Sequence, residues 1–195
     1  MNWIRPPGPV GPRLVVGLLG GSFNPAHEGH RYVSEVARKA LGLGAVWWLV
    51  TPGNPLKRAS ELADLITRGA LARQVAPRRD IVTDIEGMLG TRYTIDTLRA
   101  LHRRFPATRF VWLMGSDNLA GFGRWKDWAA IARQVPIVVV RRPGSALDTL
   151  KSPLLRRFGQ RGRLTAPPCV LVLDGPRSPQ SSTAIRMALE PRLMA

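Results

Sequence analysis

The sequence predicts an α/β fold, in which one parallel β-sheet of five or six strands carries helices on both faces. Short runs of β-branched and aliphatic residues alternate along the 195-residue chain with segments whose apolar residues recur at helical spacing. The chain is long enough for one α/β domain and short for two, and its 45% hydrophobic content argues against disorder. Such alternation is typical of a Rossmann-like sheet, whose ligands bind at the edge where the strands end.

The predicted elements follow one another in order along the chain. Apolar runs predict strands at residues 14–19, 45–50, 81–85, 110–114, 136–140 and 170–173. Helical spacing or capping residues predict helices at 31–41, from about Ser60, from Tyr93, at 129–134, near 154–158 and after Ser181. Residues 1–12, rich in proline and glycine, are expected to be a flexible N-terminal segment, and residues 13–195 a single domain.

The apolar spacing also predicts which side of two helices is buried. The helix expected from Ser60, with Ser60 as its N-cap, would carry one face made of Leu62, Leu65, Ile66, Gly69 and Ala70. The helix that opens at Tyr93 would turn Ile95, Leu98, Leu101 and Phe105 inward. Both faces are therefore expected to pack against the sheet.

The turn between the first strand and the first helix is the most informative stretch, Gly20-Gly21-Ser22-Phe23-Asn24-Pro25-Ala26-His27-Glu28-Gly29-His30. Gly20 and Gly21 lack a β-carbon, so the backbone there is expected to turn sharply and to approach a ligand closely. His27 and His30 are three residues apart and would share one face of the first helical turn. Imidazoles beside the amides of a helix N-terminus suit negative oxygens, most simply those of phosphates.

Other interpretations of this turn stay open on the residues alone. Two glycines after a strand also form plain tight turns. The histidines could bind a metal if Glu28 or Asp117 completed the shell, since the only other histidine is His102 and the only cysteine is Cys169. The glycine spacing matches neither G-x-G-x-x-G nor G-x-x-x-x-G-K-[ST], so a phosphate site here would be of another kind.

The turn resembles the signature of the HxGH nucleotidyltransferases, written GG-[ST]-F-[DN]-P-x-H-x-G-H, at all the fixed positions. Residues 181–186 resemble the family's second motif, I-S-S-T-x-I-R, with Gln180 in place of the first isoleucine. The resemblance implies the HxGH nucleotidyltransferase fold and transfer of a nucleotidyl group from ATP or CTP to a phosphate, with release of pyrophosphate. It implies an ATP site made of Gly20, Gly21, Ser22, Phe23, His27, Gly29, His30, Gly115, Asp117, Ser181, Ser182, Thr183 and Arg186. On the residues alone, the hydroxyls at 181–183 could be no more than an N-cap cluster.

The middle of the chain carries five further segments in a characteristic order, at residues 52–57, 93–98, 115–117, 125 and 141–144. In these segments the chain resembles the bacterial nicotinate-nucleotide adenylyltransferases within that family. The resemblance implies that nicotinate mononucleotide is the acceptor and binds at Asn54, Lys57, Tyr93, Thr94, Trp125 and Arg142. The chemistry is consistent, because Trp125 offers a flat face for a pyridine ring and the amides near Tyr93 and Thr94 suit a carboxylate. On the residues alone, Trp125 could instead belong to the core, and Lys57 could be a solvated loop charge.

The mechanism implied is an in-line attack of the acceptor's 5′-phosphate on the α-phosphorus of ATP. Because that nucleophile is already ionised, catalysis is expected to consist of positioning and charge stabilisation, with His27, His30, Lys57 and Arg186 as catalytic residues. Mg²⁺ is expected to arrive with ATP, since no carboxylate cluster offers it a cage. Alternatives are another HxGH enzyme, for nicotinamide mononucleotide, phosphopantetheine or glycerol phosphate, or a catalytically impaired nucleotide- or RNA-binding relative with a short tail after Arg186.

The composition sets the remaining expectations. The formal net charge is +16, but the basic residues are scattered and paired at most, so no dedicated nucleic-acid partner is expected. One cysteine allows no disulfide within the chain, and the first apolar run is too short for a signal peptide or a membrane span. A cytoplasmic protein without a membrane partner is therefore predicted, and an oligomer is possible.

Overall fold

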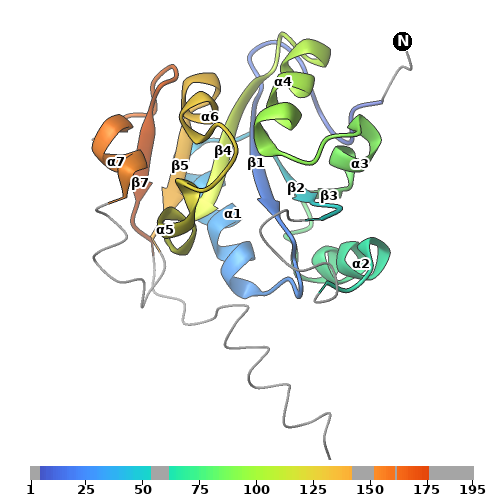
Figure 1. The fold of residues 1–195 in the computed structure, drawn as a ribbon. Helices are drawn as coiled ribbons and strands as arrows, with labels where there is room; N and C mark the ends of the chain where they lie inside the picture. Colours follow the sequence, from blue (N-terminus) through green and yellow to red (C-terminus); the bar gives the residue numbers. More distant parts are fainter. Residues whose placement is uncertain (1–4, 54–61, 142–151, 161, 176–195) are drawn as a thin grey trace, which may run out of the picture.

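Among the residues that the structure describes, seven parallel strands form one sheet in the order β3-β2-β1-β4-β5-β7-β6 (Figure 1). The structure is a computed structural model, and it describes residues 5–53, 62–141, 152–160 and 162–175. The strands are β1 (Val15–Gly21), β2 (Ala45–Val50), β3 (Ile81–Thr83), β4 (Arg109–Gly115), β5 (Ile137–Val140), β6 (Gly159–Gln160) and β7 (Val170–Leu173). The parallel sheet is thus confirmed, and in this described part the two-residue β6 takes the strand number above the predicted five or six.

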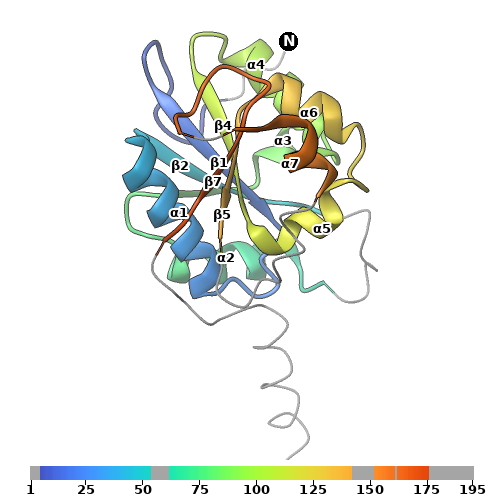
Figure 2. The ribbon, with the colours of Figure 1, turned by 90° about the vertical axis from the view of Figure 1, so that its left-hand side faces the viewer.

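Helices cover both faces of the sheet, as the sequence predicts. They are α1 (Glu28–Leu41), α2 (Leu65–Val75), α3 (Ile85–Leu89), α4 (Thr94–Arg104), the 3₁₀ turn η2 (Ser116–Asn118), α5 (Leu119–Phe122), α6 (Trp128–Gln134) and α7 (Pro153–Phe158). Figure 2 shows α1 and α2 on one side of the strands and α3 to α7 on the other, so the molecule has three layers.

An apolar core lies on each side of the sheet, and β2, which lies between β3 and β1, contributes to both. Trp47 and Leu49 pack with the side of α3 to α7, whereas Val46 and Trp48 pack with the side of α1 and α2. All six residues of β2 are buried. Because a strand covered on both faces needs apolar residues at every position, its sequence is a continuous apolar run, and its bounds agree with the prediction.

Helix α2 differs most from its prediction. It begins at Leu65 rather than near Ser60, which lies outside the described residues, and Asp64 is its N-cap, accepting from the Thr67 amide at 2.9 Å. The predicted face is wrong in part: Leu65 packs against the core and Gly69 is buried, but Ile66 is 83% exposed and Ala70 is exposed too. The largest fully buried side chain of this helix is a charged one, Arg68, whose guanidinium donates to the Ser22 carbonyl oxygen.

The start of α1 and the end of the third strand also differ from the sequence prediction, whereas the inward face of α4 agrees with it. Helix α1 begins at Glu28 instead of residue 31, because His27 caps it. The third strand ends at Thr83, whose hydroxyl oxygen accepts from the amide of Ile85, and Ile85 then begins α3. The inward face of α4 is confirmed, with Ile95, Leu98 and Leu101 buried and Phe105 partly buried against the same core.

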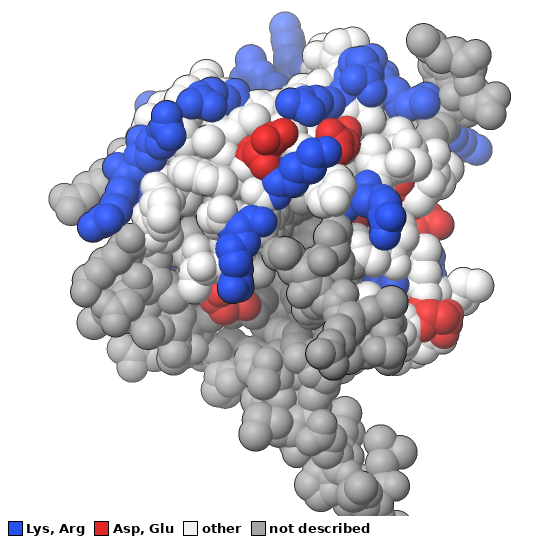
Figure 3. Space-filling model, in the orientation of Figure 1, with Lys and Arg blue, Asp and Glu red and all other residues white. Residues whose placement is uncertain are grey.

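The described part of the N-terminal segment contacts the body of the protein. The amide of Gly11 donates to the Thr108 hydroxyl at 2.9 Å, and Val10 packs against the core on the α4 side of the sheet. In the described chain, no helix has both the length and the apolar character needed to cross a bilayer. Basic side chains are spread widely over the face seen in Figure 3, with few acidic ones among them.

Candidate active site

The two glycine-ended strands at the centre of the sheet mark the candidate site. β1 pairs with β2 on one side and with β4 on the other, and Leu19 lies opposite Leu113, so Gly21 and Gly115 end their strands at the same edge. The strand order reverses between β1 and β4, which is the place where ligands of open α/β sheets bind. The exposed Asp117 follows β4 in η2 and lies at this edge too.

The two glycines serve a different purpose from the expected sharp turn. Both are still in β1, with Gly20 opposite Leu49 and Gly21 opposite Val50. A β-carbon on Gly20 would lie 2.4 Å from Cη2 of Trp112, and one on Gly21 would lie 3.2 Å from the ring of Phe23. The glycines therefore make room for two aromatic rings, and the chain turns after them, at Phe23, whose φ is 45°.

His27 and His30 lie together at the start of α1, as predicted, with ring centroids 3.9 Å apart. The amide of Gly29 donates to Nδ1 of His27 at 3.0 Å, and the amide of His27 donates to Nδ1 of His30 at 3.2 Å. A neutral imidazole that accepts at Nδ1 carries its hydrogen on Nε2, so both rings have an Nε2–H donor. Such donors suit the oxygens of a phosphate.

The same hydrogen bonds argue against the alternative metal site. If a metal bound Nε2 of either ring, the hydrogen of a neutral imidazole would move to Nδ1, where a backbone N–H already donates. Within the described residues, no group of three or more His, Cys, Asp and Glu side chains could hold a metal ion. The pair is therefore best interpreted as two hydrogen-bond donors.

Phe23 packs against one of these histidines, His30. Its ring is buried, meets the ring of His30 edge-on at 4.9 Å and stacks on Trp48 at 5.2 Å. An aromatic contact of this kind restricts the orientation of an imidazole as well as burying apolar surface. The side chain of Phe23, predicted at the ATP site, thus packs beneath the histidines.

Arg68 is a residue of the site that the sequence reasoning missed. Its guanidinium donates to the carbonyl oxygens of Ser22 at 2.7 Å, Thr51 at 2.9 Å, Ala63 at 2.7 Å and Pro52 at 3.4 Å. It thereby joins the turn after β1 to the chain after β2. Burial lowers the pKa of Arg68 from its ordinary value, and Asp64 opposes that shift. No sequence signal identified it, because an arginine in a short helix is usually solvated.

On the other face of the sheet, Tyr93 and Thr94 open α4. Tyr93 is the N-cap and makes no side-chain capping bond, and its carbonyl oxygen accepts from the amides of Asp96 and Thr97. The amides of Thr94 and Ile95 precede those that bond within the helix, so this end of α4 favours an anion. The predicted carboxylate contact is consistent with this geometry.

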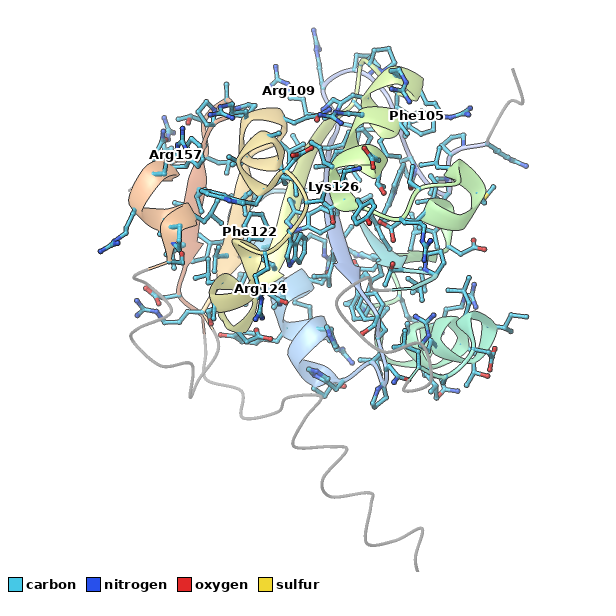
Figure 4. All side chains as sticks on the ribbon, viewed as in Figure 1. Phe105, Arg109, Phe122, Arg124, Lys126 and Arg157 are labelled. Carbon is cyan, nitrogen blue, oxygen red and sulfur yellow. The ribbon has the colours of Figure 1, made fainter. Side chains whose placement is uncertain are left out.

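Trp125 lies near this helix start, in the segment between α5 and α6. It is half-buried, with its ring edge-on to Trp112 at 6.0 Å and tilted on Phe122 at 4.9 Å. The next residue, Lys126, places its ammonium 4.5 Å from the Tyr93 ring and 3.1 Å from Asp96 (Figure 4). The structure therefore brings the predicted ring contact and the predicted carboxylate contact into one region.

Glu86 is a second residue that the sequence reasoning missed. It is 5% exposed, and its carboxylate accepts from the hydroxyl of Thr97 at 3.0 Å. Burial raises the pKa of the Glu86 carboxyl, and the nearby side chains of Thr97 and Thr51 oppose the rise. The bond to Thr97 reaches the first turn of α4.

Part of the predicted site lies outside the described residues. These positions are Asn54, Lys57, Arg142, Ser181, Ser182, Thr183 and Arg186. Their roles therefore stay predictions from the sequence. The predicted site residues that the structure does describe are those of the first motif together with Gly115, Asp117, Tyr93, Thr94 and Trp125.

Comparisons with curated proteins match this chain over most of its length. A family model described as cytidylyltransferase-like matches residues 18–188. A protein from Erythrobacter litoralis, named probable nicotinate-nucleotide adenylyltransferase, is 53% identical over 90% of this chain and 84% of its own length. One of the same name from Parvibaculum lavamentivorans is 50% identical over 90% of this chain and 92% of its own length.

The fold is also similar to that of solved structures. One is Plasmodium falciparum nicotinic acid mononucleotide adenylyltransferase, solved in one complex with APC and in another with NaAD. The TM-score is 0.69, and the match covers 91% of this chain and 84% of that one. Sequence identity is only 16%, so this likeness concerns the fold.

Proposed function

This chain belongs to the cytidylyltransferase-like family, among the nicotinate-nucleotide adenylyltransferases, and from that premise we propose that it transfers the adenylyl group of ATP to nicotinate mononucleotide. The products are nicotinate adenine dinucleotide and pyrophosphate, and the reaction belongs to NAD biosynthesis. ATP enters with its Mg²⁺ as the substrate. The proposed place of action is the cytoplasm, in accord with a chain that contains a single cysteine.

The observation that carries this proposal is the histidine pair at the start of α1. Backbone amides fix the tautomer of both rings, so their Nε2–H groups are donors at the edge where β1 and β4 end. Charge that develops on phosphate oxygens is stabilised by donors already in position, because no reorganisation is then needed during the reaction. His27 and His30 are accordingly assigned to the triphosphate and its transition state.

The reaction itself needs little proton transfer. The 5′-phosphate of the acceptor is ionised at neutral pH and attacks the α-phosphorus of ATP, while the bond from that phosphorus to the pyrophosphate oxygen breaks. Alignment of the two nucleotides supplies much of the rate enhancement. From the sequence, Ser181, Ser182, Thr183 and Arg186 are proposed to hold the β- and γ-phosphates, and Lys57 to neutralise charge on the polyphosphate.

The acceptor is proposed to bind on the α4 side of the sheet. The amides at the start of α4, near Tyr93 and Thr94, would receive the nicotinate carboxylate, and Trp125 would contact the pyridine ring. Lys126 supports this arrangement, since it contacts Tyr93 and Asp96 at the start of α4 from the position next to Trp125. Asn54, Lys57 and Arg142 are proposed from the sequence as further acceptor contacts.

The test is release of pyrophosphate from MgATP with four separate acceptors. These are nicotinate mononucleotide, nicotinamide mononucleotide, phosphopantetheine and glycerol phosphate, and CTP replaces ATP in a parallel series. The proposal expects the highest kcat/KM with ATP and nicotinate mononucleotide. A higher value with any other pair would reassign the substrate, and no release with any pair would refute the proposed activity.

A further inference from the structure

We propose that Glu86 is a positioning residue for the acceptor, which acts by fixing the start of α4 against the carboxyl end of β2. The inference rests on the proposed function, because it concerns the half of the site that would bind the pyridine nucleotide. Glu86 itself is buried and is not assigned a contact with either substrate. Its effect would be transmitted through Thr97 and Tyr93.

A directed chain of hydrogen bonds leads from the start of α4 to the Glu86 carboxylate. The Thr97 hydroxyl donates to Oε1 of Glu86 at 3.0 Å, and the Thr91 and Thr97 hydroxyl oxygens lie 2.8 Å apart. Since the Thr97 hydrogen points to Glu86, Thr91 donates to Thr97. The backbone of Glu86 takes part as well, because its carbonyl oxygen accepts from the Thr91 amide at 2.9 Å.

These bonds control the residues to which the acceptor's carboxylate is assigned. Residues 91 and 97 flank Tyr93 and Thr94, and both are held by Glu86. Thr97 Oγ1 also lies 3.3 Å from the carbonyl oxygen of Tyr93. A change of the Glu86 side chain therefore loosens the Thr97 end of the short segment that presents the amides of α4, while the backbone bond to Thr91 remains.

The same carboxylate reaches the carboxyl end of β2. The side chain of Thr51, which directly follows β2, lies close enough to the carboxylate to lower its pKa, while its hydroxyl donates to the carbonyl oxygen of Gly53 at 3.2 Å and its amide to that of Gly21 at 3.1 Å. Gly21 is the last residue of β1, so the connection runs from the first-motif strand to the acceptor side. Glu86 thus sets the position of α4 relative to the edge where the reaction is proposed to occur.

A purely structural role does not require an ionisable group at this place. Burying a carboxyl costs free energy that an apolar side chain of similar size would not cost, and within the described residues no cation forms an ion pair with Glu86. What the carboxylate provides is a fixed direction, because it accepts the Thr97 hydroxyl of α4 at a defined place beside the end of β2. A subsite that binds the acceptor nucleotide needs its contacting groups to be held in fixed directions.

The chain offers a matched control in Asp80. This carboxylate is also buried, and it accepts from the Ser34 hydroxyl and, at 3.0 Å, from Nε1 of Trp48. Asp80 precedes β3, whereas Glu86 follows it, so the two carboxylates lie at opposite edges of the sheet. Loss of either one should disturb stability, but only Glu86 is connected to the start of α4.

The experiment compares Glu86→Gln, Thr97→Val and Asp80→Asn with the wild-type protein. Steady-state kinetics give KM for nicotinate mononucleotide and for MgATP, and urea unfolding gives the stability of each variant. We expect E86Q and T97V each to raise KM for the acceptor by about tenfold while KM for MgATP changes by less than about twofold. D80N should leave the ratio of the two KM values unchanged.

The double variant E86Q/T97V completes the design. Both single changes act on the same contact, which E86Q weakens by removing the charge of the hydrogen-bond acceptor and T97V removes with the hydroxyl. The acceptor KM of the double variant should therefore be close to that of T97V rather than to the product of the two single effects. Equal changes in the KM values for the acceptor and for MgATP would overturn the inference, and so would an unchanged acceptor KM in E86Q. If E86Q does not fold, the acceptor KM of T97V decides. A wild-type protein that releases no pyrophosphate with nicotinate mononucleotide would instead refute the proposed function, and this inference with it.

Discussion

The guanidinium of Arg68 donates to the carbonyl oxygen of Ser22 at 2.7 Å, 46 residues away in the sequence. Ser22 is the first residue of the turn that follows β1, and the same nitrogen of Arg68 also donates to Thr51 after β2. A cation that is 1% exposed thus fixes two neighbouring chain segments through carbonyl oxygens. Its fork of donors is suited to this task, because one ammonium could not reach several carbonyls in fixed directions.

Arg68→Lys should lower the free energy of unfolding by about 1–3 kcal/mol, because carbonyl oxygens at a buried site lose their donors. It should also raise KM for MgATP, since the turn that carries Ser22 is no longer fixed. Urea unfolding and steady-state kinetics measure the two effects. Arg73→Lys, on the exposed side of the same helix, is the control and should change neither value. An R68K protein as stable as R73K would show that the four carbonyl contacts contribute little.

His30→Ala should lower kcat by about a hundred-fold or more, the scale of losing one preorganised donor to developing charge. Single-turnover kinetics with MgATP and nicotinate mononucleotide measure it. His102→Gln is the control, because His102 lies in the last turn of α4, at the other end of that helix from Tyr93, and bonds to Leu98 and Gln134. Near-normal turnover in a folded H30A protein would remove His30 from the catalytic residues.

Gly20→Ala should lower the free energy of unfolding by about 1–3 kcal/mol, because the new methyl group would lie 2.4 Å from Trp112 in a packed core. Gly21→Ala should cost less, since the nearest atom there, in Phe23, lies at 3.2 Å. Gly69→Ala is the control: its β-carbon would meet Arg73 at an ordinary 3.6 Å, and alanine favours the helix. Thermal unfolding should give the lowest melting temperature for G20A, a higher one for G21A and the highest for G69A. Equal melting temperatures would contradict the steric explanation.

The stability of the protein should depend on pH through Glu86. Burial raises the pKa of its carboxyl in the folded state above the ordinary 4.5, so the folded protein binds this proton more tightly than the unfolded chain. The stabilising contribution is complete below pH 4.5 and is lost as the pH rises through the raised pKa. E86Q cannot titrate, so the wild-type free energy of unfolding minus that of E86Q should fall as the pH rises from 4.5.

Urea unfolding of both proteins over a pH series gives this difference. A difference that stays constant with pH would mean that Glu86 titrates alike in the folded and unfolded chains. The wild-type free energy of unfolding minus that of D80N should also fall as the pH rises. The reason is that burial raises the pKa of Asp80, although hydrogen bonds from Ser34 and Trp48 oppose that rise. Both declines are thus expected to begin near the ordinary carboxyl pKa values, 4.5 for Glu86 and 3.8 for Asp80, and to continue as the pH rises through the raised pKa of each group.

The sequence by itself determined the sheet and the first motif. β2 could be predicted to the residue, because a strand buried on both faces must be apolar throughout, and burial of that kind is visible in the residue types. The histidine pair could be predicted because its bonds are local: His27 accepts from Gly29 two residues on, and His30 accepts from His27 three residues back. Hydrogen bonds between residues this close in the sequence can be predicted from the sequence alone.

Only the tertiary structure decided where the charged residues went. Nothing local distinguishes Arg68 or Glu86 from a solvated surface charge, because their partners come from other elements, 46 residues away for Ser22 and 11 for Thr97. The same holds for Gly20, whose missing β-carbon makes room for Trp112 on the neighbouring strand. Residue types and spacing specify apolar burial and local turns, whereas a buried polar contact exists only once the chain has brought its two partners together.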